Sequence, residues 1–342
     1  MRIAQLAPLW KSVPPHKYGG KELIVSLLTE QLVMLGHEVY LYACAGSKTK
    51  GHLRKIIDKP MFDLVGGFKF DAVQYYDFLS MKQVFDDAKA RKIDIIHNHM
   101  DYQVSIFQDF FSVPMLTTLH SSLKPDCELL ARASASSNYI SISKAQRSLA
   151  PYLNYIDTVY HGIDTHDIPY SFRQGDYLLF LATVRKEKGI DRAIKIARRT
   201  KEKLIIAGDI RQQSDFDAIK PFIDDKQITF VGEVTSRQKQ ILMRDAKAYL
   251  FPIRWNEAFG LTVIEALASG TPVIAYPNGS LPELIEDGKT GFLVSSIDEA
   301  VKAVGNIGKI SREYCRQKAQ ERFDVDTMAK NYIKIYKKLL HP

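Results

Sequence analysis

The sequence predicts an α/β protein made of two doubly wound domains, each with a parallel β-sheet covered by helices on both faces. Short, near-continuous apolar runs alternate with amphipathic stretches along the whole chain, which is typical of parallel strands connected by helices. The chain has 342 residues, more than one hydrophobic core usually serves. Its 46% hydrophobic and 25% charged residues are ordinary for a globular protein and exclude disorder and collagen-like repeats.

The first half of the chain carries six apolar runs that predict strands. They lie at residues 2–7, 39–43, 94–97, 115–119, 139–142 and 158–161. Amphipathic stretches between them predict helices. The first of these, residues 22–35, ends at Gly36, directly after its last apolar position.

The second half repeats this alternation and predicts a second sheet. Its strands are expected at residues 178–181, 204–207, 228–231, 249–252, 273–275 and 291–294. Pro169 and Gly175 interrupt a polar segment between the two halves. We therefore expect a first domain over residues 1–168 and a second over 169–325. A C-terminal helix over 326–342 is expected to pack back toward the first domain.

Cysteine content and hydropathy indicate a cytoplasmic protein. The three cysteines are odd in number, far apart and without a CxxC pair, which favours reduced thiols and argues against a zinc site. No stretch approaches the ~20 apolar residues that a membrane span needs. The first eight residues lack the long apolar core of a signal peptide and instead predict a buried strand.

The net charge of +8 is concentrated at the end of the chain, where the last 42 residues carry ten Lys and Arg against four Asp and Glu. The favoured interpretation is the solvated face of a terminal helix. Peripheral contact with anionic lipid at the inner face of the membrane, or with an acidic partner, is the alternative. Nucleic-acid binding is not predicted, because no recognition motif accompanies the charge.

The segment 251–275 carries the strongest functional signal. A strand is expected to end near Pro252, and after a loop a helix is expected from Gly260 to Ser269, where Gly270 ends it. In open α/β sheets, ligands bind beyond the carboxyl ends of the strands, which is where this loop lies.

The start of this predicted helix has the chemistry of an anion site. The amides of Gly260, Leu261 and Thr262 lack intrahelical acceptors and favour a phosphate. Glu257 lies in the loop before the helix. Glu265 lies about one turn inside it, where a carboxylate can accept hydrogen bonds from two neighbouring hydroxyls, as a ribose presents.

The motifs in this order resemble those of family 4 retaining glycosyltransferases, the glycosyl transferases group 1, which have the GT-B fold. The resemblance covers nearly the whole chain. In chain order, the matching motifs are Tyr18-Gly19-Gly20-Lys21-Glu22, Gly36-His37-Glu38-Val39, Thr117-Thr118-Leu119-His120, Ser141-Ile142-Ser143, His161-Gly162-Ile163-Asp164, Glu187-Lys188-Gly189, Ile206-Ala207-Gly208-Asp209, Glu257-Ala258-Phe259-Gly260-Leu261, Gly270-Thr271-Pro272-Val273 and Pro282-Glu283-Leu284-Ile285-Glu286-Asp287-Gly288. The resemblance implies two Rossmann-like domains that face each other across a cleft, with the acceptor side in the first domain and the donor side in the second.

The resemblance also implies a role for each matching residue. Glu257 corresponds to the carboxylate that faces the hydroxyls of the donor sugar, and Glu265 to the carboxylate that binds the ribose. Lys188 corresponds to the lysine that neutralises the leaving diphosphate, and His120 to the histidine that contacts the sugar. The residues that correspond to donor-binding backbone and loop positions are Gly19, Gly20, Gly232, Glu233, Val234, Phe259, Gly260, Leu261 and Thr262.

One departure from the family pattern concerns the diphosphate. The family usually has Gly-Arg shortly before Glu-Lys-Gly, and here Ala182 and Thr183 stand at those places. The loss of one of two cations could cost several kcal/mol of transition-state stabilisation. Arg185, two residues further on, either replaces the missing cation or is a solvated loop charge.

Metal sites are not expected. His97 and His99 alternate after a strand as a metal pair can, but no third ligand of obvious spacing lies nearby, so ordinary strand-end histidines are favoured. The Asp-x-Asp segments at 215–217 and 324–326 are not expected to bind a metal either, because they lie far from a glycine-rich phosphate loop.

The resemblance therefore implies a retaining, metal-independent hexosyltransferase that needs no cofactor. It would take a nucleotide-diphosphate sugar, UDP- or GDP-linked, to a hydroxyl of a sugar or lipid-linked acceptor in glycan or glycolipid biosynthesis. Two alternatives stay open. One is a nucleotide-sugar 2-epimerase or another GT-B enzyme, and the other is a catalytically impaired nucleotide-sugar-binding protein.

Overall fold

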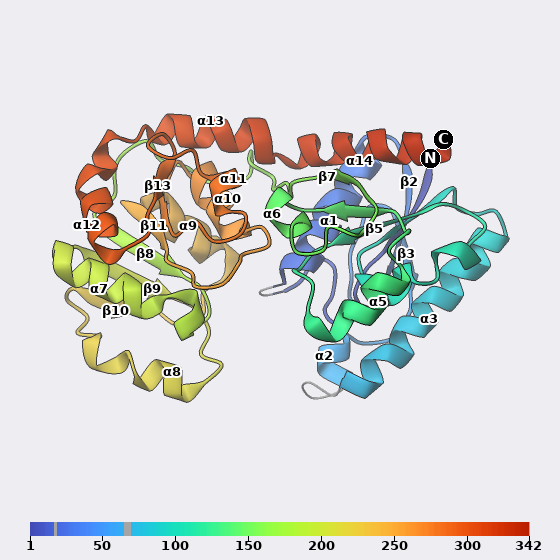
Figure 1. The fold of residues 1–342 in the computed structure, drawn as a ribbon, viewed down its shortest axis with the longest axis horizontal. Helices are drawn as coiled ribbons and strands as arrows, with labels where there is room; N and C mark the ends of the chain where they lie inside the picture. The colour runs from blue at the N-terminus through green and yellow to red at the C-terminus, as the bar shows by residue number, and fades with distance from the viewer. Residues whose placement is uncertain (17–18, 65–69, 342) are drawn as a thin grey trace. The chain divides into compact units, whose positions relative to one another are not determined.

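The computed structural model describes residues 1–16, 19–64 and 70–341, and it divides the chain into two units, each with its own parallel sheet (Figure 1). The first unit comprises Met1–Gly162 together with the chain from Val325 onward, and the second comprises Ile163–Asp324. The predicted α/β class with two doubly wound sheets is confirmed. The chain passes from one unit to the other a few residues before the predicted boundary at 168/169.

The sheet of the first unit has seven strands in the order β3-β2-β1-β4-β5-β6-β7, and every pair of neighbours is parallel. The strands are β1 (Arg2–Leu6), β2 (Glu38–Ala43), β3 (His52–Lys55), β4 (Ile95–Asn98), β5 (Met115–Leu119), β6 (Tyr139–Ser141) and β7 (Tyr155–Thr158). The helices of this unit are α1 (Gly20–Met34), α2 (Met61–Leu64), α3 (Phe70–Lys89), α4 (Tyr102–Ser105), α5 (Glu128–Ala133), α6 (Lys144–Arg147) and α14 (Val325–Leu340).

Both faces of this sheet are covered, as the near-continuous apolar strands require. Neighbouring residues of β2 show it, since successive side chains of a strand point to opposite faces. Tyr42 packs in one core cluster with Val84 of α3. Leu41 packs in another cluster with Val25 of α1.

Helix α14 belongs to the first unit and packs against α1. Its buried face includes Tyr332 and Tyr336, whereas its lysines lie exposed on the other side. These exposed lysines are Lys330, Lys334, Lys337 and Lys338. Part of the basic excess at the end of the chain is thus a solvent-facing helix surface. Within the ranges that the structure describes, no helix combines the length and the apolarity needed to cross a membrane.

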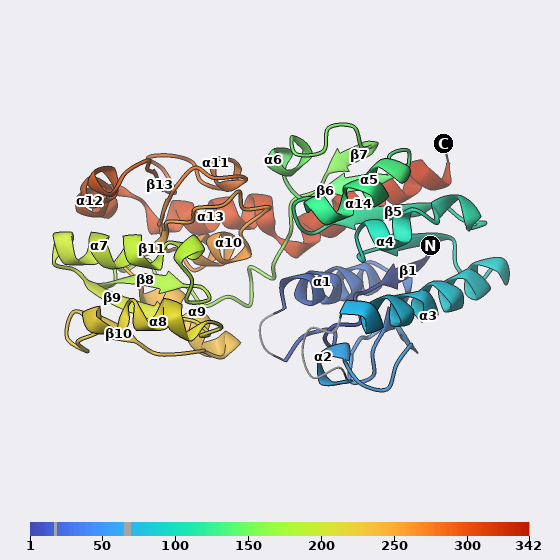
Figure 2. The same ribbon diagram turned by 60° about the horizontal axis from the view of Figure 1, so that its bottom comes forward.

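The sheet of the second unit has six parallel strands in the order β10-β9-β8-β11-β12-β13. The strands are β8 (Tyr177–Leu181), β9 (Lys203–Ala207), β10 (Ile228–Phe230), β11 (Ala248–Phe251), β12 (Val273–Ala275) and β13 (Gly291–Leu293). The helices are α7 (Ile190–Thr200), α8 (Gln213–Asp217), α9 (Ser236–Asp245), α10 (Leu261–Ala268), α11 (Leu281–Leu284), α12 (Ile297–Asn306) and α13 (Arg312–Phe323). Helices α7 and α9 contact β8, and α10 contacts β11 and β12 (Figure 2).

Two strands of the first unit differ from the sequence prediction. Strand β3 was not expected, because it is a short edge strand with two basic residues and mostly exposed side chains, so it lacks the apolar run of a buried strand. The run predicted as a strand at 158–161 lies almost wholly after β7. Val159 and His161 are buried there, but they belong to the connection that follows the strand.

Arg312, the first residue of α13, holds the second unit together at the amino ends of its strands. It is only 6% exposed. Its guanidinium donates to the carbonyl oxygens of Ser171, Ala246 and Arg244 at 2.7, 2.7 and 2.6 Å, and to Oγ1 of Thr271 at 2.8 Å. These bonds join α13 to the start of the unit and to the segments that enter β11 and β12.

We expect Arg312→Met to lower the free energy of unfolding by about 3 kcal/mol, because buried acceptors lose a charged donor. Urea unfolding followed by circular dichroism measures this loss.

Arg199→Met is the matched control in the same unit. Arg199 pairs with Asp298 at 2.5 Å, but both side chains are more than half exposed. We expect it to change the free energy of unfolding by no more than about 0.5 kcal/mol. Equal losses for the two variants would contradict the role given to Arg312.

Candidate functional site

The candidate site of the second unit lies where the order of its strands reverses. Strand β8 has β9 on one side and β11 on the other. Connections that leave the carboxyl ends of such neighbouring strands diverge, and the crevice between them is where doubly wound sheets bind ligands. The turn with Lys188 follows β8, and the loop with Glu257 follows β11. The two segments that the sequence singled out therefore flank this reversal.

Gly189 fixes the turn that carries Lys188. The 3-10 turn Lys186–Lys188 passes into α7 through Gly189, which has φ +81°. A Cβ at this position would lie 2.0 Å from the carbonyl oxygen of Pro252, the residue after β11. Only glycine permits both this backbone conformation and this contact, so the lysine turn lies directly against the end of β11.

Arg254 ties the loop after β11 to the same turn. Its guanidinium makes two hydrogen bonds to the carboxylate of Asp191 in α7, both 2.7 Å long, and also donates to the carbonyl oxygen of Lys186. Its own amide donates to the carbonyl oxygen of Glu187 at 2.9 Å. Two parallel hydrogen bonds between a guanidinium and a carboxylate fix the orientation of the arginine as well as its distance from the partner.

The other side of this loop is held by the segment that follows β12. The side-chain amide of Asn278 donates to the carbonyl oxygen of Ile253 at 2.7 Å, and Ser280 Oγ donates to that of Phe259 at 2.6 Å. Gly279 lies between them, where a Cβ would come within 2.2 Å of the Glu257 carbonyl oxygen. The loop is therefore constrained on both sides.

Lys188, Glu257 and Trp255 form one cluster at the reversal point. Lys188 Nζ lies 3.8 Å from Glu257 Oε2 and 3.8 Å from the centroid of the Trp255 ring. The Trp255 indole N–H donates to the same Glu257 oxygen at 3.1 Å. The side chains of Lys188 and Glu257 are only 21% and 19% exposed, so the pair is largely desolvated.

Burial lowers the pKa of Lys188 below its ordinary value of 10.5, and the attraction of Glu257 does not reverse this shift. The positive charges of Arg185 and Arg211 lower the pKa further. Three cationic side chains thus act on one small region, and an anion placed there would stabilise the charged form of Lys188.

Thr183, which stands at the place of the family's arginine, takes part in a network that carries a cation. Its hydroxyl donates to Asp209 Oδ1 at 2.6 Å, and Asp209 Oδ2 accepts from Arg211 at 2.8 Å. Arg185 lies 3.4 Å from the carboxylate of Glu187. Each arginine thus lies beside a carboxylate, and the charges of both act on Lys188. Only Arg185 was considered from the sequence.

The helix start at Gly260 has the predicted form. Helix α10 begins at Leu261, with Gly260 as its N-cap at φ +97°, a left-handed conformation that favours glycine. The amides of Leu261 and Thr262 lie in the first turn, where they have no intrahelical acceptor. Thr262 Oγ1 is held by Tyr249 Oη at 2.9 Å, and Phe259 is buried.

Glu265 and the segment 232–234 lie near the same edge of the sheet. Gly232, Glu233 and Val234 follow β10 and lead into α9. Glu265 in α10 is only 8% exposed, and its Oε1 lies 2.5 Å from Nζ of Lys239 in α9. Lys239 was not predicted from the sequence, because nothing in its spacing indicates that α9 brings it to Glu265.

The first-unit candidates also gather where a strand order reverses, here between β1 and β4. Gly19 and Gly20 begin α1 after β1, whereas Tyr18 of the same motif lies outside the described residues. Lys21 forms an ion pair with Asp101, which follows β4. The other Asp101 oxygen accepts from the amide of His120 at 3.1 Å.

His97 and His99 are held by protein side chains rather than placed as an open metal pair. His97 Nδ1 lies 2.7 Å from Tyr336 Oη, on α14. His99 Nε2 lies 2.7 Å from Gln5 Oε1, and its Nδ1 lies 2.8 Å from His120 Nε2. Within the ranges 1–16, 19–64 and 70–341, no group of three or more His, Cys, Asp or Glu side chains is placed to hold a metal ion.

Burial keeps the histidines of this cluster neutral at ordinary pH. It lowers the pKa of His97 and of His161 to about 3. The pKa values of His99 and His120 also lie well below the usual value, first because of burial and then because of the neighbouring histidines and Lys21. His120 can therefore contact a ligand as a neutral ring and not as a cation.

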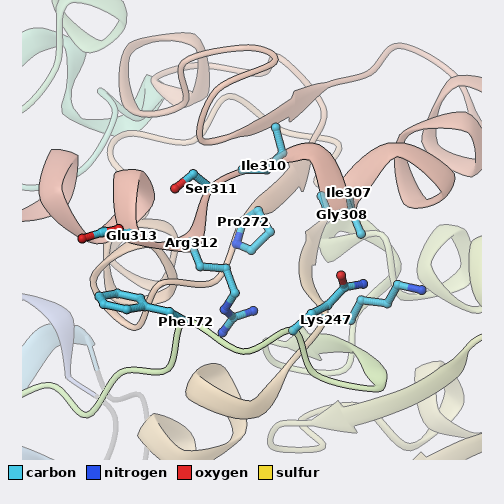
Figure 3. A pocket seen from close by; sticks show the side chains of 10 residues that line it. Phe172, Lys247, Pro272, Ile307, Gly308, Ile310, Ser311, Arg312 and Glu313 are labelled. Carbon is cyan, nitrogen blue, oxygen red and sulfur yellow. The ribbon is translucent and has the colours of Figure 1, made fainter.

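The second unit also contains a cavity of about 300 Å³ (Figure 3). Lys247 and Pro272, which directly precede β11 and β12, line it together with Arg312. It therefore opens at the amino ends of the strands, opposite the edge that carries Lys188 and Glu257. The guanidinium of Arg312 is already bonded to protein oxygens there.

Comparison with known proteins places the second unit in a family. Residues 166–322 match the family "Glycosyl transferases group 1". A relative from Klebsiella pneumoniae, "Uncharacterized 41.2 kDa protein in cps region", is 34% identical over 170 residues. The match covers 47% of this chain and 46% of that protein, so it spans about half the length of that relative.

Solved structures resemble the whole chain. AviGT4, a glycosyltransferase involved in avilamycin A biosynthesis, gives a TM-score of 0.76 at 22% identity over 99% of this chain and 98% of its own. Anabaena HepE in complex with UDP gives a TM-score of 0.74 at 17% identity over 99% of this chain and 100% of its own. At these identities the likeness establishes the fold. Residues 166–322 thus match a glycosyltransferase family, and the chain as a whole has the GT-B fold of these solved structures.

Proposed function

We propose that this protein transfers a hexosyl group from a nucleotide-diphosphate sugar to a hydroxyl acceptor in glycan or glycolipid biosynthesis, with retention of configuration and without a metal ion. The observation that carries the proposal is the cationic cluster at the β8/β11 reversal. Lys188 is only 21% exposed there and lies 3.8 Å from Glu257, and the charges of Arg185 and Arg211 act on it. A leaving diphosphate needs such a concentration of positive charge.

The residues of the second unit divide the work between the leaving group and the sugar. Lys188, Arg185 and Arg211 stabilise the departing diphosphate, together with the first amides of α10. Glu257 accepts hydrogen bonds from hydroxyls of the sugar and so orients it. Glu265 binds the ribose, and the backbone of residues 232–234 contacts the base. In the first unit, we assign contact with the sugar to His120 and contact with the diphosphate to Gly19 and Gly20.

The transfer itself exchanges one bond at the anomeric carbon. The bond from this carbon to the oxygen of the diphosphate breaks, and the electron pair leaves with the diphosphate. The acceptor oxygen bonds to the same face of the carbon, which retains configuration. Its proton passes to the departing diphosphate oxygen, so no separate base is needed. Positive side chains supply the charge that a metal ion would otherwise supply, and we expect activity to persist in EDTA.

UDP is the first nucleotide to test, because HepE was solved in complex with it. A thermal-shift panel of UDP-, GDP- and ADP-sugars identifies the donor, since a ligand at 100 times its dissociation constant adds about 2.7 kcal/mol of stability.

With the selected donor, we expect Lys188→Met and Glu257→Gln each to lower the turnover by at least about 100-fold.

Lys203→Met serves as the control for these variants. Lys203 pairs with Asp176 at 3.1 Å, and both side chains are largely exposed. We expect it to keep wild-type turnover. Near-normal turnover in either site variant would show that the assignment is wrong. Donor binding without hydrolysis or transfer in the wild type would instead favour a binding protein.

The affinity for the nucleoside diphosphate should fall as the pH rises, and the fall should begin below the ordinary lysine pKa of 10.5. The reason is that only protonated Lys188 attracts the anion, and burial has lowered its pKa. Calorimetric titration with UDP between pH 7 and 10 measures this dependence. Lys188→Met should bind more weakly with a flatter profile. A wild-type profile as flat as that of the variant would contradict the role of Lys188.

Arg185 and Arg211 can be separated by comparing a diphosphate with a monophosphate. We expect Arg185→Gln and Arg211→Gln each to weaken UDP binding by about tenfold and to leave UMP binding nearly unchanged, because each loses one charged hydrogen bond to the terminal phosphate. If only one variant shows the loss, that arginine alone replaces the family's cation. If neither variant weakens UDP binding, neither arginine replaces the cation that the family has at the position of Thr183.

A further inference from the structure

The two oxygens of the Glu265 carboxylate have different environments. Oε1 is held by Lys239 Nζ at 2.5 Å. Oε2 is buried, and it has no hydrogen-bond partner among the described residues. A buried carboxylate oxygen without a donor is costly. A ligand that brings a hydroxyl hydrogen to Oε2 would remove this cost.

Lys239 is placed by the rigid start of α9. Thr235 and Gln238 form a capping box there, in which the Thr235 side chain accepts from the Gln238 amide and the Gln238 side chain accepts from the Thr235 amide. The amide of Lys239 then donates to the Thr235 carbonyl oxygen at 2.8 Å. Helix α9 packs against α10, and the Lys239 side chain is only 23% exposed. The ammonium group is therefore brought to Glu265 by fixed backbone.

An ordinary structural ion pair is the simplest explanation, and the same unit contains one for comparison. Lys247 and Glu202 also lie 2.5 Å apart, with side chains 19% and 24% exposed. Among the described residues, Glu202 has no buried oxygen without a partner, whereas Glu265 has. The unpartnered Oε2 is what distinguishes the Lys239–Glu265 pair from the structural pair.

We propose that Lys239 is a positioning and specificity residue for the ribose of the donor nucleotide, an inference that rests on the proposed function. Lys239 fixes the Glu265 carboxylate so that Oε2 accepts from one ribose hydroxyl. The remaining N–H groups of its ammonium donate to the oxygen of the neighbouring hydroxyl. An acceptor and a donor side by side match a pair of adjacent hydroxyls, each of which can donate and accept.

Such a site selects ribonucleotides over deoxyribonucleotides. A nucleotide that lacks one hydroxyl leaves either the carboxylate oxygen or the ammonium unpaired in a desolvated place. For this reason, sites that hydrogen-bond a hydroxyl reject analogues that lack that hydroxyl. Without Lys239, the carboxylate is free to turn toward water, and much of the discrimination should disappear.

Isothermal titration calorimetry with UDP, 2′-deoxy-UDP and 3′-deoxy-UDP tests the proposal. If the donor panel selects another base, the corresponding GDP or ADP series replaces it. We expect the wild type to prefer the ribonucleotide by at least about tenfold over one of the deoxy forms. Lys239→Met should reduce that ratio to less than about threefold, and Lys239→Arg should restore most of it, because arginine also donates to the carboxylate.

Lys247→Met is the matched control, since it removes a similar ion pair elsewhere in the unit, and we expect it to keep the wild-type ratio. The ratio compares ligands on one variant, so a general loss of stability does not change it. An unchanged ratio in Lys239→Met, or no preference in the wild type, would overturn this inference while UDP binding still supported the proposed function. If the wild type binds none of UDP, GDP and ADP, the proposed function fails and this inference with it.

Discussion

The contact between Gly189 and the carbonyl oxygen of Pro252 is the constraint on which the candidate site depends. It brings the turn after β8 against the end of β11, where a side chain at position 189 would come within 2.0 Å of that oxygen. Lys188 precedes this glycine, so its backbone is fixed relative to the loop that carries Glu257. Arg254 strengthens the same junction through Asp191. The ends of β8 and β11 are rigid, and one glycine sets the distance between the turn that carries Lys188 and the loop that carries Glu257.

Sequence reasoning was most reliable for the buried strands. The bounds of β5 (Met115–Leu119) and β12 (Val273–Ala275) agree with those predicted, because every residue of both strands is buried. The edge strand β3 was missed, since an exposed edge needs no apolar run. The helix start at Gly260 was predicted from a glycine and the pattern around it, which are local features of the chain.

The side-chain partners within the site could not be predicted in the same way. Trp255 was part of the singled-out segment, yet its contact with Lys188 depends on how the loop folds back. Arg211 and Lys239 come from different connections of the second sheet, and only the order of the strands brings each to the site edge. Spacing along the chain does not predict such contacts. The family resemblance predicts them only for positions that follow the family pattern.

The electrostatics of the two units point to different kinds of contact. Buried histidines in the first unit are neutral, so His120 offers a ring that exchanges hydrogen bonds without charge. In the second unit, burial and neighbouring arginines work against the charge of Lys188, and Glu257 does not offset them. Glu257 also accepts from Trp255, and at 3.8 Å its attraction for Lys188 is incomplete. A buried cation with incomplete compensation favours an anion strongly. A diphosphate, more negative once it has left the sugar than before, gains most from such a site at the moment when the bond breaks.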